Sequence, residues 1–216
     1  MTRVDDLIDR LSADVQAVRP LNPPATRALG WLAAVAVLGG LAIYFFSDPR
    51  QLLSRYAGRE GLMALEMAAM LATGVLAVIG AFFAAVPGRS QRWLLAPVAP
   101  FVVWLILSGA GCYRDLARTG PAGLEIGHSV KCLIFILIAS PILGAPLFWF
   151  LARARPIAPL PVALLGGLGV AALAAFLLQF FHPFAVTFVD LAVHLVAIAF
   201  VVAATALFNR RALSPA

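Results

Sequence analysis

Residues 62–86 read LMALEMAAMLATGVLAVIGAFFAAV, and this stretch decides the class of fold. Glu66 is its one charged residue. A helix of about 20 apolar residues crosses the ~30 Å hydrocarbon core of a bilayer. Because lipid offers no partners to backbone N–H and C=O groups, such a segment has to be helical. The stretch therefore predicts a transmembrane helix.

Five further apolar runs lie on either side of this stretch, separated by short polar segments. The chain of 216 residues is 62% apolar and 12% charged, with a mean hydropathy of +0.97. Globular domains carry about 25% charged residues, so an ordinary soluble fold is excluded. We predict an all-α membrane protein, a bundle of six transmembrane helices at residues 28–46, 62–86, 93–111, 130–151, 160–181 and 184–208.

The basic residues predict how the bundle lies in the membrane. With the N-terminus inside, the inner segments hold ten arginines and the outer segments hold six basic residues. Positive charge concentrates on the cytoplasmic side, so we expect both chain ends in the cytoplasm and the bundle in a bacterial inner membrane. The organisation would be a cytoplasmic segment with a Pro-rich spacer (1–24), a membrane domain (25–209) and a cytoplasmic tail (210–216).

The net charge of +6 does not indicate nucleic-acid binding. The basic residues occur as pairs and triples at the ends of the apolar runs, where anionic lipid accounts for them. A nucleic-acid surface would instead carry a dense basic patch. The sequence thus favours contact with the bilayer.

The N-terminal segment differs from the rest of the chain because it is amphipathic and acidic. Its apolar residues recur at the spacing of one helix face. A helix that only lies on an anionic membrane is rich in Lys and Arg, whereas aspartates here favour a protein partner with a groove for an amphipathic helix. A solvated or self-packed tail is the alternative. The predicted binding face and its acidic flank comprise Val4, Asp5, Leu7, Ile8, Leu11, Asp14, Val15 and Val18.

Two cysteines flank one predicted outer loop. Cys112 ends the third predicted span and Cys132 begins the fourth. If those two helices pack together, the thiols can meet at their shared end, and the periplasm permits a disulfide. Closing a loop of about 20 residues would contribute roughly 3 kcal/mol in the chain-entropy model. We predict a bridge or a redox-sensitive pair; two buried thiols that act as small apolar groups are the alternative.

Three ionisable residues fall well inside the predicted spans, away from the end position of Lys131. Glu66 lies early in the second, and Asp190 and His194 lie four residues apart in the sixth. Such groups usually face the bundle interior and often serve function. A proton relay in a small proton-coupled transporter is one reading. We favour the other, in which they satisfy polar neighbours and fix the rotation of their helices.

Glycines 166, 167 and 169 predict that the fifth span approaches a neighbour closely. The sequence has no serine-nucleophile motif, no HExxH and no phosphate-binding loop, so we expect no enzyme activity, no cofactor and no metal site. The cysteines do not form a CxxC motif. A membrane thiol oxidoreductase is therefore a second, weaker alternative to a regulatory role.

The chain resembles the NrsF family over nearly its whole length. The N-terminal segment carries most of the resemblance, together with the placement of the cysteines. The matching features are VDDLIDRLSADV at 4–15, AVRPL at 17–21, Pro23-Pro24, Cys112, Cys132-Leu133, Ser140-Pro141 and His194.

This family consists of polytopic bacterial anti-sigma factors that restrain extracytoplasmic-function sigma factors. The resemblance implies that the N-terminal segment holds a sigma factor at the membrane. It also implies that Cys112 and Cys132 take part in a response to metal or oxidative stress outside. The expected partners are then a sigma factor and the lipid bilayer, with no direct contact to nucleic acid.

Overall fold

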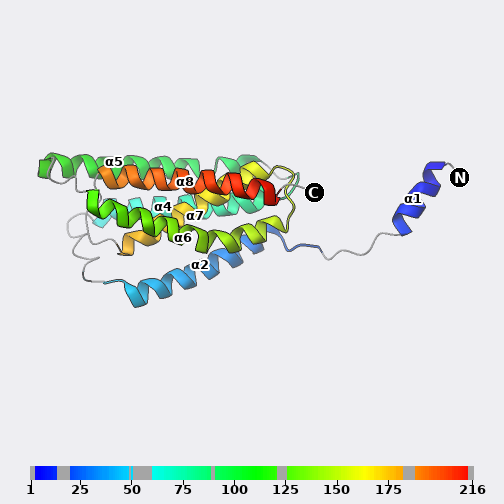
Figure 1. The fold of residues 1–216 in the computed structure, drawn as a ribbon, viewed down its shortest axis with the longest axis horizontal. Coiled ribbons are helices and arrows are strands. Elements are labelled where there is room, and N and C mark those ends of the chain that lie inside the picture. The colour runs from blue at the N-terminus through cyan, green and yellow to red at the C-terminus, as the bar shows by residue number, and fades with distance from the viewer. Residues whose placement is uncertain are drawn as a thin grey trace.

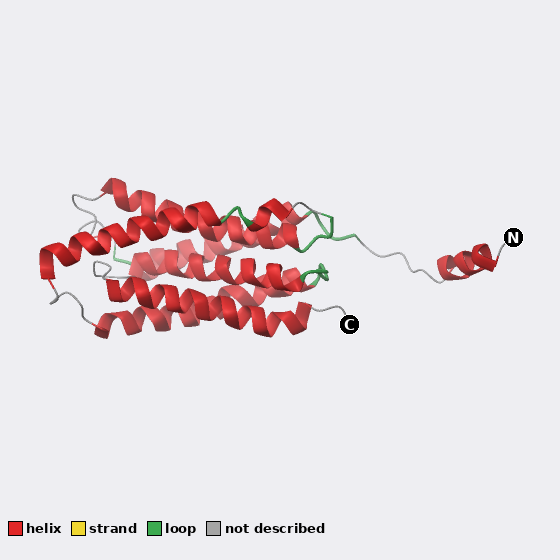
Figure 2. Ribbon diagram, turned by 90° about the horizontal axis from the view of Figure 1, so that it is seen from above, coloured by secondary structure: helices red, strands yellow, loops and turns green. Residues whose placement is uncertain are grey.

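The computed structural model describes residues 3–13, 20–48, 50, 60–88, 91–120, 126–181 and 188–213. Throughout this part of the chain the regular structure is helical, which confirms the all-α membrane fold (Figures 1 and 2). The helices are α1 (Arg3–Ala13), α2 (Pro24–Phe46), α4 (Glu60–Ala84), the 3₁₀ turn η1 (Gln91–Leu94), α5 (Val98–Thr119), α6 (Ile126–Ala152), α7 (Pro159–Phe181) and α8 (Phe188–Leu213).

Six of these helices are long and apolar enough to cross a membrane, so the chain is a multi-pass membrane protein. Both views place the start of α2 and the end of α8 at the same end of the bundle (Figures 1 and 2). We call it the terminal end, and the other the loop end. The apolar stretches are Pro24–Phe46, Gly61–Ala84, Arg92–Arg114, Val130–Ala152, Pro159–Phe181 and Phe188–Leu207.

Several helix boundaries differ from the limits of the apolar runs. The α2 helix begins at Pro24, since a proline at the first helical position loses no hydrogen bond and has a suitable φ. The α5 helix continues past Gly111 to Thr119, because polar residues can extend a helix beyond the hydrocarbon. Cys112 therefore lies within a helix and not at its end.

The α7 helix is the centre of the bundle. Two thirds of its span, 67%, is buried, and it packs against α4, α6, α8 and α2. Its glycines meet three neighbours, since Gly166 lies against α6, Gly167 against α8 and Gly169 against α4, and small residues allow two helices to approach closely. The prediction of close approach from residues 166–169 is thus confirmed.

One close approach joins α7 to α4 through Gly169 and Gly74. A Cβ atom added at Gly169 would lie 2.7 Å from Cγ2 and 3.1 Å from the backbone nitrogen of Val78, and 3.2 Å from the carbonyl oxygen of Gly74. Two of these neighbours are backbone atoms, so a side chain there would force the helices apart. Lipid tails are as apolar as the helix surfaces, so this contact stabilises the pair through packing.

Gly169→Val should therefore destabilise the bundle, by about 1–3 kcal/mol as for other overpacked sites. Gly40→Val in α2 is the control, because Gly40 has open space around its Cα. Thermal unfolding in mild detergent measures both variants. Equal loss of stability in the two would contradict the close α4–α7 contact.

Candidate functional site

The α1 helix exposes its apolar face to solvent. Val4, Leu7, Ile8 and Leu11 are each more than half exposed. An ion pair between Asp6 and Arg10 at 3.1 Å lies on the polar side, where exposure leaves it little effect on stability. No other described element covers this apolar face of α1. Most other exposed apolar side chains lie on the helices of the bundle, where they face lipid.

Both views show α1 away from the bundle, beyond its terminal end (Figures 1 and 2). Asp5 lies in its first turn, where a negative charge complements the helix dipole. Asp14, Val15 and Val18 of the predicted binding face lie outside the described residues. The structure therefore brings together five of the eight predicted residues: Val4, Asp5, Leu7, Ile8 and Leu11.

The two cysteines are buried thiols near the loop end of the bundle. Cys112 in α5 is 2% exposed and Cys132 in α6 is 1% exposed. Cys132 belongs to an apolar cluster with Trp104, Ile136 and Leu178. Both thiols are thus packed inside the bundle and not at its surface.

The expectation that the cysteine-bearing helices pack as direct neighbours is wrong. Within the described part of the chain, α5 packs mainly on α4, α6 packs on α8 and α7, and α5 and α6 make little contact. The α8 helix contacts both of them. Chain order does not fix packing order here, because α8, the last helix of the chain, packs on α6 more extensively than α5 does.

Glu66 in α4 accepts a hydrogen bond from the Ser108 hydroxyl of α5. Ser108 is almost fully buried and lies one helical turn before Cys112. The bond joins two helices through a charged acceptor inside an apolar layer. It agrees with the expectation that Glu66 fixes helix orientation, and Ser108 is the partner that sequence reasoning missed.

Asp190 and His194 are both buried in α8, each 3% exposed. The His194 Nδ1 atom lies 2.6 Å from the backbone carbonyl of Asp190, so the ring N–H donates to the backbone and not to the carboxylate. The Asp190 carboxylate lies close enough to the Cys132 sulfur to act on it electrostatically. The α8 polar residues thus face the cysteine of α6.

No group of three or more His, Cys, Asp and Glu side chains suited to a metal ion occurs among the residues whose placement is described. The side chain of His128 lies outside them. Cys132 with Asp190 would offer a metal ion only two ligands, one sulfur and one oxygen.

Two arginines contact aromatic side chains at the terminal end of the bundle. Arg27 of α2 donates to the carbonyl oxygen of Phe150 in α6 and lies 5.2 Å from the centre of the Phe82 ring. The Arg153 guanidinium stacks 3.6 Å from the centre of the Trp149 ring. These contacts tie the ends of three helices together on the side where α1 is attached.

A protein-family model matches this chain. The family model is NrsF, described as negative regulator of sigma F, and it matches residues 11–214. The matched range contains both cysteines and all six apolar helices. No curated protein and no solved structure gives a significant match.

The Glu66–Ser108 contact predicts a difference between two serine variants. Ser108→Ala removes a donor to the partly buried Glu66 carboxyl and should cost about 1–2 kcal/mol. Ser140→Ala is the matched control, because the buried Ser140 hydroxyl has no hydrogen-bond partner in the structure and its removal should be neutral or stabilising. Thermal unfolding of both variants in detergent measures the difference, and the reverse order would contradict a helix-joining role for Glu66.

Proposed function

The chain belongs to the NrsF family of negative regulators of sigma F, and from this premise we propose that α1 holds an extracytoplasmic-function sigma factor at the bacterial inner membrane. The family match makes the protein a negative regulator of a sigma factor. The proposal adds which segment binds, which class of sigma factor is bound and on which side of the membrane.

The observation that carries this proposal is the exposed apolar face of α1. An isolated helix of 11 residues is marginally stable in water, since helices shorter than about 12–15 residues gain too little to offset nucleation. Both views show α1 away from the bundle, and its leucines, valine and isoleucine are exposed. A partner with an apolar groove would both cover this face and stabilise the helix.

The acidic flank of α1 suits a partner with a basic surface. Asp5, Asp6 and Asp9 surround the apolar stripe, and proteins that act on DNA carry basic patches. Opposite charges raise the rate of association and oppose wrong partners. The bundle itself then anchors the complex, because six apolar helices keep α1 at the bilayer surface.

We place α1 in the cytoplasm, where a sigma factor is found. The terminal end of the bundle carries the start of α2 and the end of α8, so an inward N-terminus sets an inward C-terminus as well. Ten arginines against six basic residues favour this orientation. The cysteines then lie toward the periplasm.

We also propose that Cys112 and Cys132 report periplasmic redox or metal stress. Each cysteine lies near a carboxyl group. Cys112 is one helical turn from Ser108, which donates to Glu66, and Cys132 is within electrostatic range of Asp190. A modified thiol in such a tightly packed layer would move α5 or α6 against α8. To invert a strong bias between binding and release, the modification has to favour release by about 5 kcal/mol.

The two other function classes gain no specific support from the described residues. A proton-coupled carrier would need Glu66, Asp190 and His194 along one path, yet Glu66 bonds to Ser108 and His194 bonds to its own helix. A thiol oxidoreductase would need a CxxC-like reactive pair, and Cys112 and Cys132 lie 20 residues apart in the sequence.

Leu11→Asp in α1 should weaken sigma-factor binding by about 2 kcal/mol, or roughly 30-fold, because it places a charge in the centre of the apolar face. Ala13→Asp is the matched control, since Ala13 lies on the opposite side of the same helix. Co-purification of a sigma factor with the detergent-solubilised full chain, identified by mass spectrometry, measures retention. Equal retention by both variants would place the binding site elsewhere, such as the arginine-rich inner loops.

Cys112→Ala and Cys132→Ala should leave repression intact and abolish the response to oxidant or heavy metal. If the thiols act as a pair, either single variant should lose the response as completely as the double variant. A reporter gene driven by the bound sigma factor measures this with and without the stress. A normal response in the double variant would remove the cysteines from the sensing step.

A further inference from the structure

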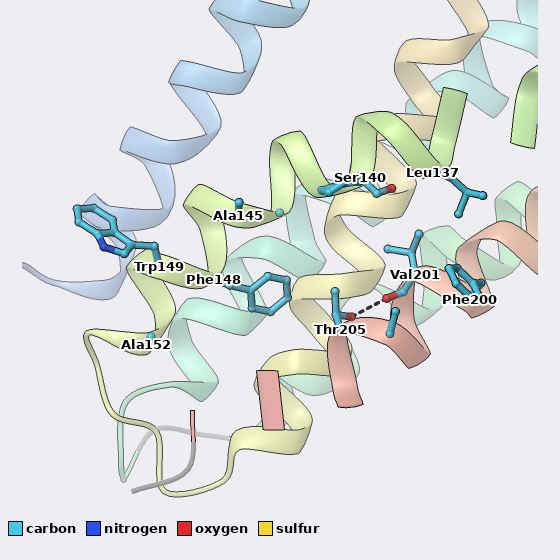
Figure 3. A pocket seen from close by; sticks show the side chains of 12 residues that line it. Leu137, Ser140, Ala145, Phe148, Trp149, Ala152, Phe200, Val201 and Thr205 are labelled. Atoms are coloured by element: carbon cyan, nitrogen blue, oxygen red, sulfur yellow. Dashed lines mark hydrogen bonds between the residues drawn. The ribbon is translucent and has the colours of Figure 1, made fainter. Parts of the chain in front are cut away.

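An apolar groove lies between α6 and α8 on the side of the bundle that faces lipid. It has a volume of about 520 Å³ and is lined by residues of α6 between Leu137 and Ala152 and of α8 between Phe200 and Thr205 (Figure 3). We call it the α6–α8 groove. Ala145 and Phe200 in its walls are exposed, so the groove opens toward the bilayer.

The surface of the groove is almost entirely apolar. Thr205 turns its hydroxyl back to the carbonyl oxygens of Val201 and Val202 in its own helix. The Ser140 hydroxyl is buried and does not reach the surface of the groove. A flexible hydrocarbon therefore fits this surface better than a ligand with polar groups along its length.

The length and level of the groove correspond to one lipid leaflet. Ser140 is near the middle of the Val130–Ala152 span, and Ala152 is its last residue. Twelve helical residues rise about 18 Å, close to the ~15 Å that half a hydrocarbon core provides. The groove thus runs from the bilayer midplane to the interface at the terminal end.

The mouth of the groove carries a cation and an interfacial aromatic ring. Trp149 lines the groove and is 54% exposed, and the Arg153 guanidinium stacks on its ring at 3.6 Å. Tryptophan is typical of the membrane interface. Arg153 thus places a positive charge beside a residue of the groove wall at the terminal end of α6.

The surrounding charge is of one sign. The described segments at the terminal end of the bundle, 20–27, 86–88, 91–95, 152–160 and 208–213, contain no Asp or Glu. They contain six arginines: Arg27, Arg92, Arg153, Arg155, Arg210 and Arg211. A phosphate of net negative charge is attracted here, whereas a zwitterionic headgroup gains much less.

We propose that the α6–α8 groove binds one acyl chain of an anionic phospholipid while Arg153 holds its phosphate. The groove is separate from α1 and from the cysteines, so this proposal does not depend on the sigma-factor proposal. Its occupant comes from the leaflet at the terminal end of the bundle. A bound lipid would fill the space between α6 and α8 on the side where α1 is attached.

Native mass spectrometry of the full chain tests this, with phosphatidylglycerol and phosphatidylcholine of identical acyl chains as probes. The delipidated protein should retain phosphatidylglycerol about fivefold more than phosphatidylcholine, the preference that one arginine near the surface provides. Arg153→Gln should remove this preference. Arg92→Gln is the control, because Arg92 is an exposed arginine at the same end, whereas Arg153 stacks on Trp149 of the groove wall.

A second pair of variants tests the acyl-chain channel. Ala145→Phe should fill the groove and abolish retention of both lipids. Ala192→Phe is its control, because Ala192 is also exposed but lines a different apolar pocket, of about 370 Å³, formed by α8 and Leu133. Thermal unfolding of each variant checks that the bundle stays folded. An unchanged unfolding temperature shows that lost lipid retention comes from the filled groove.

Three results would overturn the proposal. Equal retention of the two lipids by the unchanged protein would mean that the arginines do not select an anion. Retention unchanged by Ala145→Phe would place the lipid elsewhere. A shift from dimer to monomer on Ala145→Phe would show that a second copy of the chain occupies the groove.

Discussion

The structure depends on one constraint: inside lipid, helices are held together by close packing, because burial from water contributes nothing further between them. The α4–α7 contact meets this constraint through Gly74 and Gly169, where an added Cβ would meet backbone atoms at 3.1–3.3 Å. The other helices pack around this pair, with α8 and α6 on α7 and α5 on α4. Polar groups add directional contacts between helices, such as Ser108 with Glu66 and Arg27 with the Phe150 carbonyl.

This arrangement separates two kinds of chemistry along the bundle axis. The loop end holds the thiols and the buried carboxylates, whereas the terminal end holds arginines, the mouth of the α6–α8 groove and the attachment of α1. A regulator that responds to events on one side of a membrane and acts on the other needs such a separation. The α8 helix spans the distance, because it contacts α5 and α6 and carries Asp190 at one end and the groove residues near the other. It is therefore the element through which we expect a change at the cysteines to reach the cytoplasmic side.

The sequence allowed the class of fold to be predicted, and part of the site. Residues 62–86 are too long and too apolar for any form but a membrane helix, and the glycines at 166–169 announced a close contact. The partner in that contact could not be predicted, since Gly74 and Val78 meet Gly169 only once the order of packing is set. The same lack of packing information led to the mistaken pairing of the helices that carry Cys112 and Cys132. Ser108 could have been found, because it is the single hydroxyl between Val98 and Gly111. The groove could not, since it arises from how α6 and α8 diverge.

The central claim is that α1 faces the cytosol while the cysteine-bearing end of the bundle faces outward. Labelling of single introduced thiols in intact cells with a membrane-impermeant maleimide tests it most directly. Tyr113→Cys places a thiol at a site that is 68% exposed beside the buried Cys112, and Ser12→Cys places one on exposed α1. The unchanged protein gives the background from its two buried thiols. The account predicts that Tyr113→Cys reacts in intact cells and that Ser12→Cys reacts only after the cells are opened; the opposite pattern would contradict it.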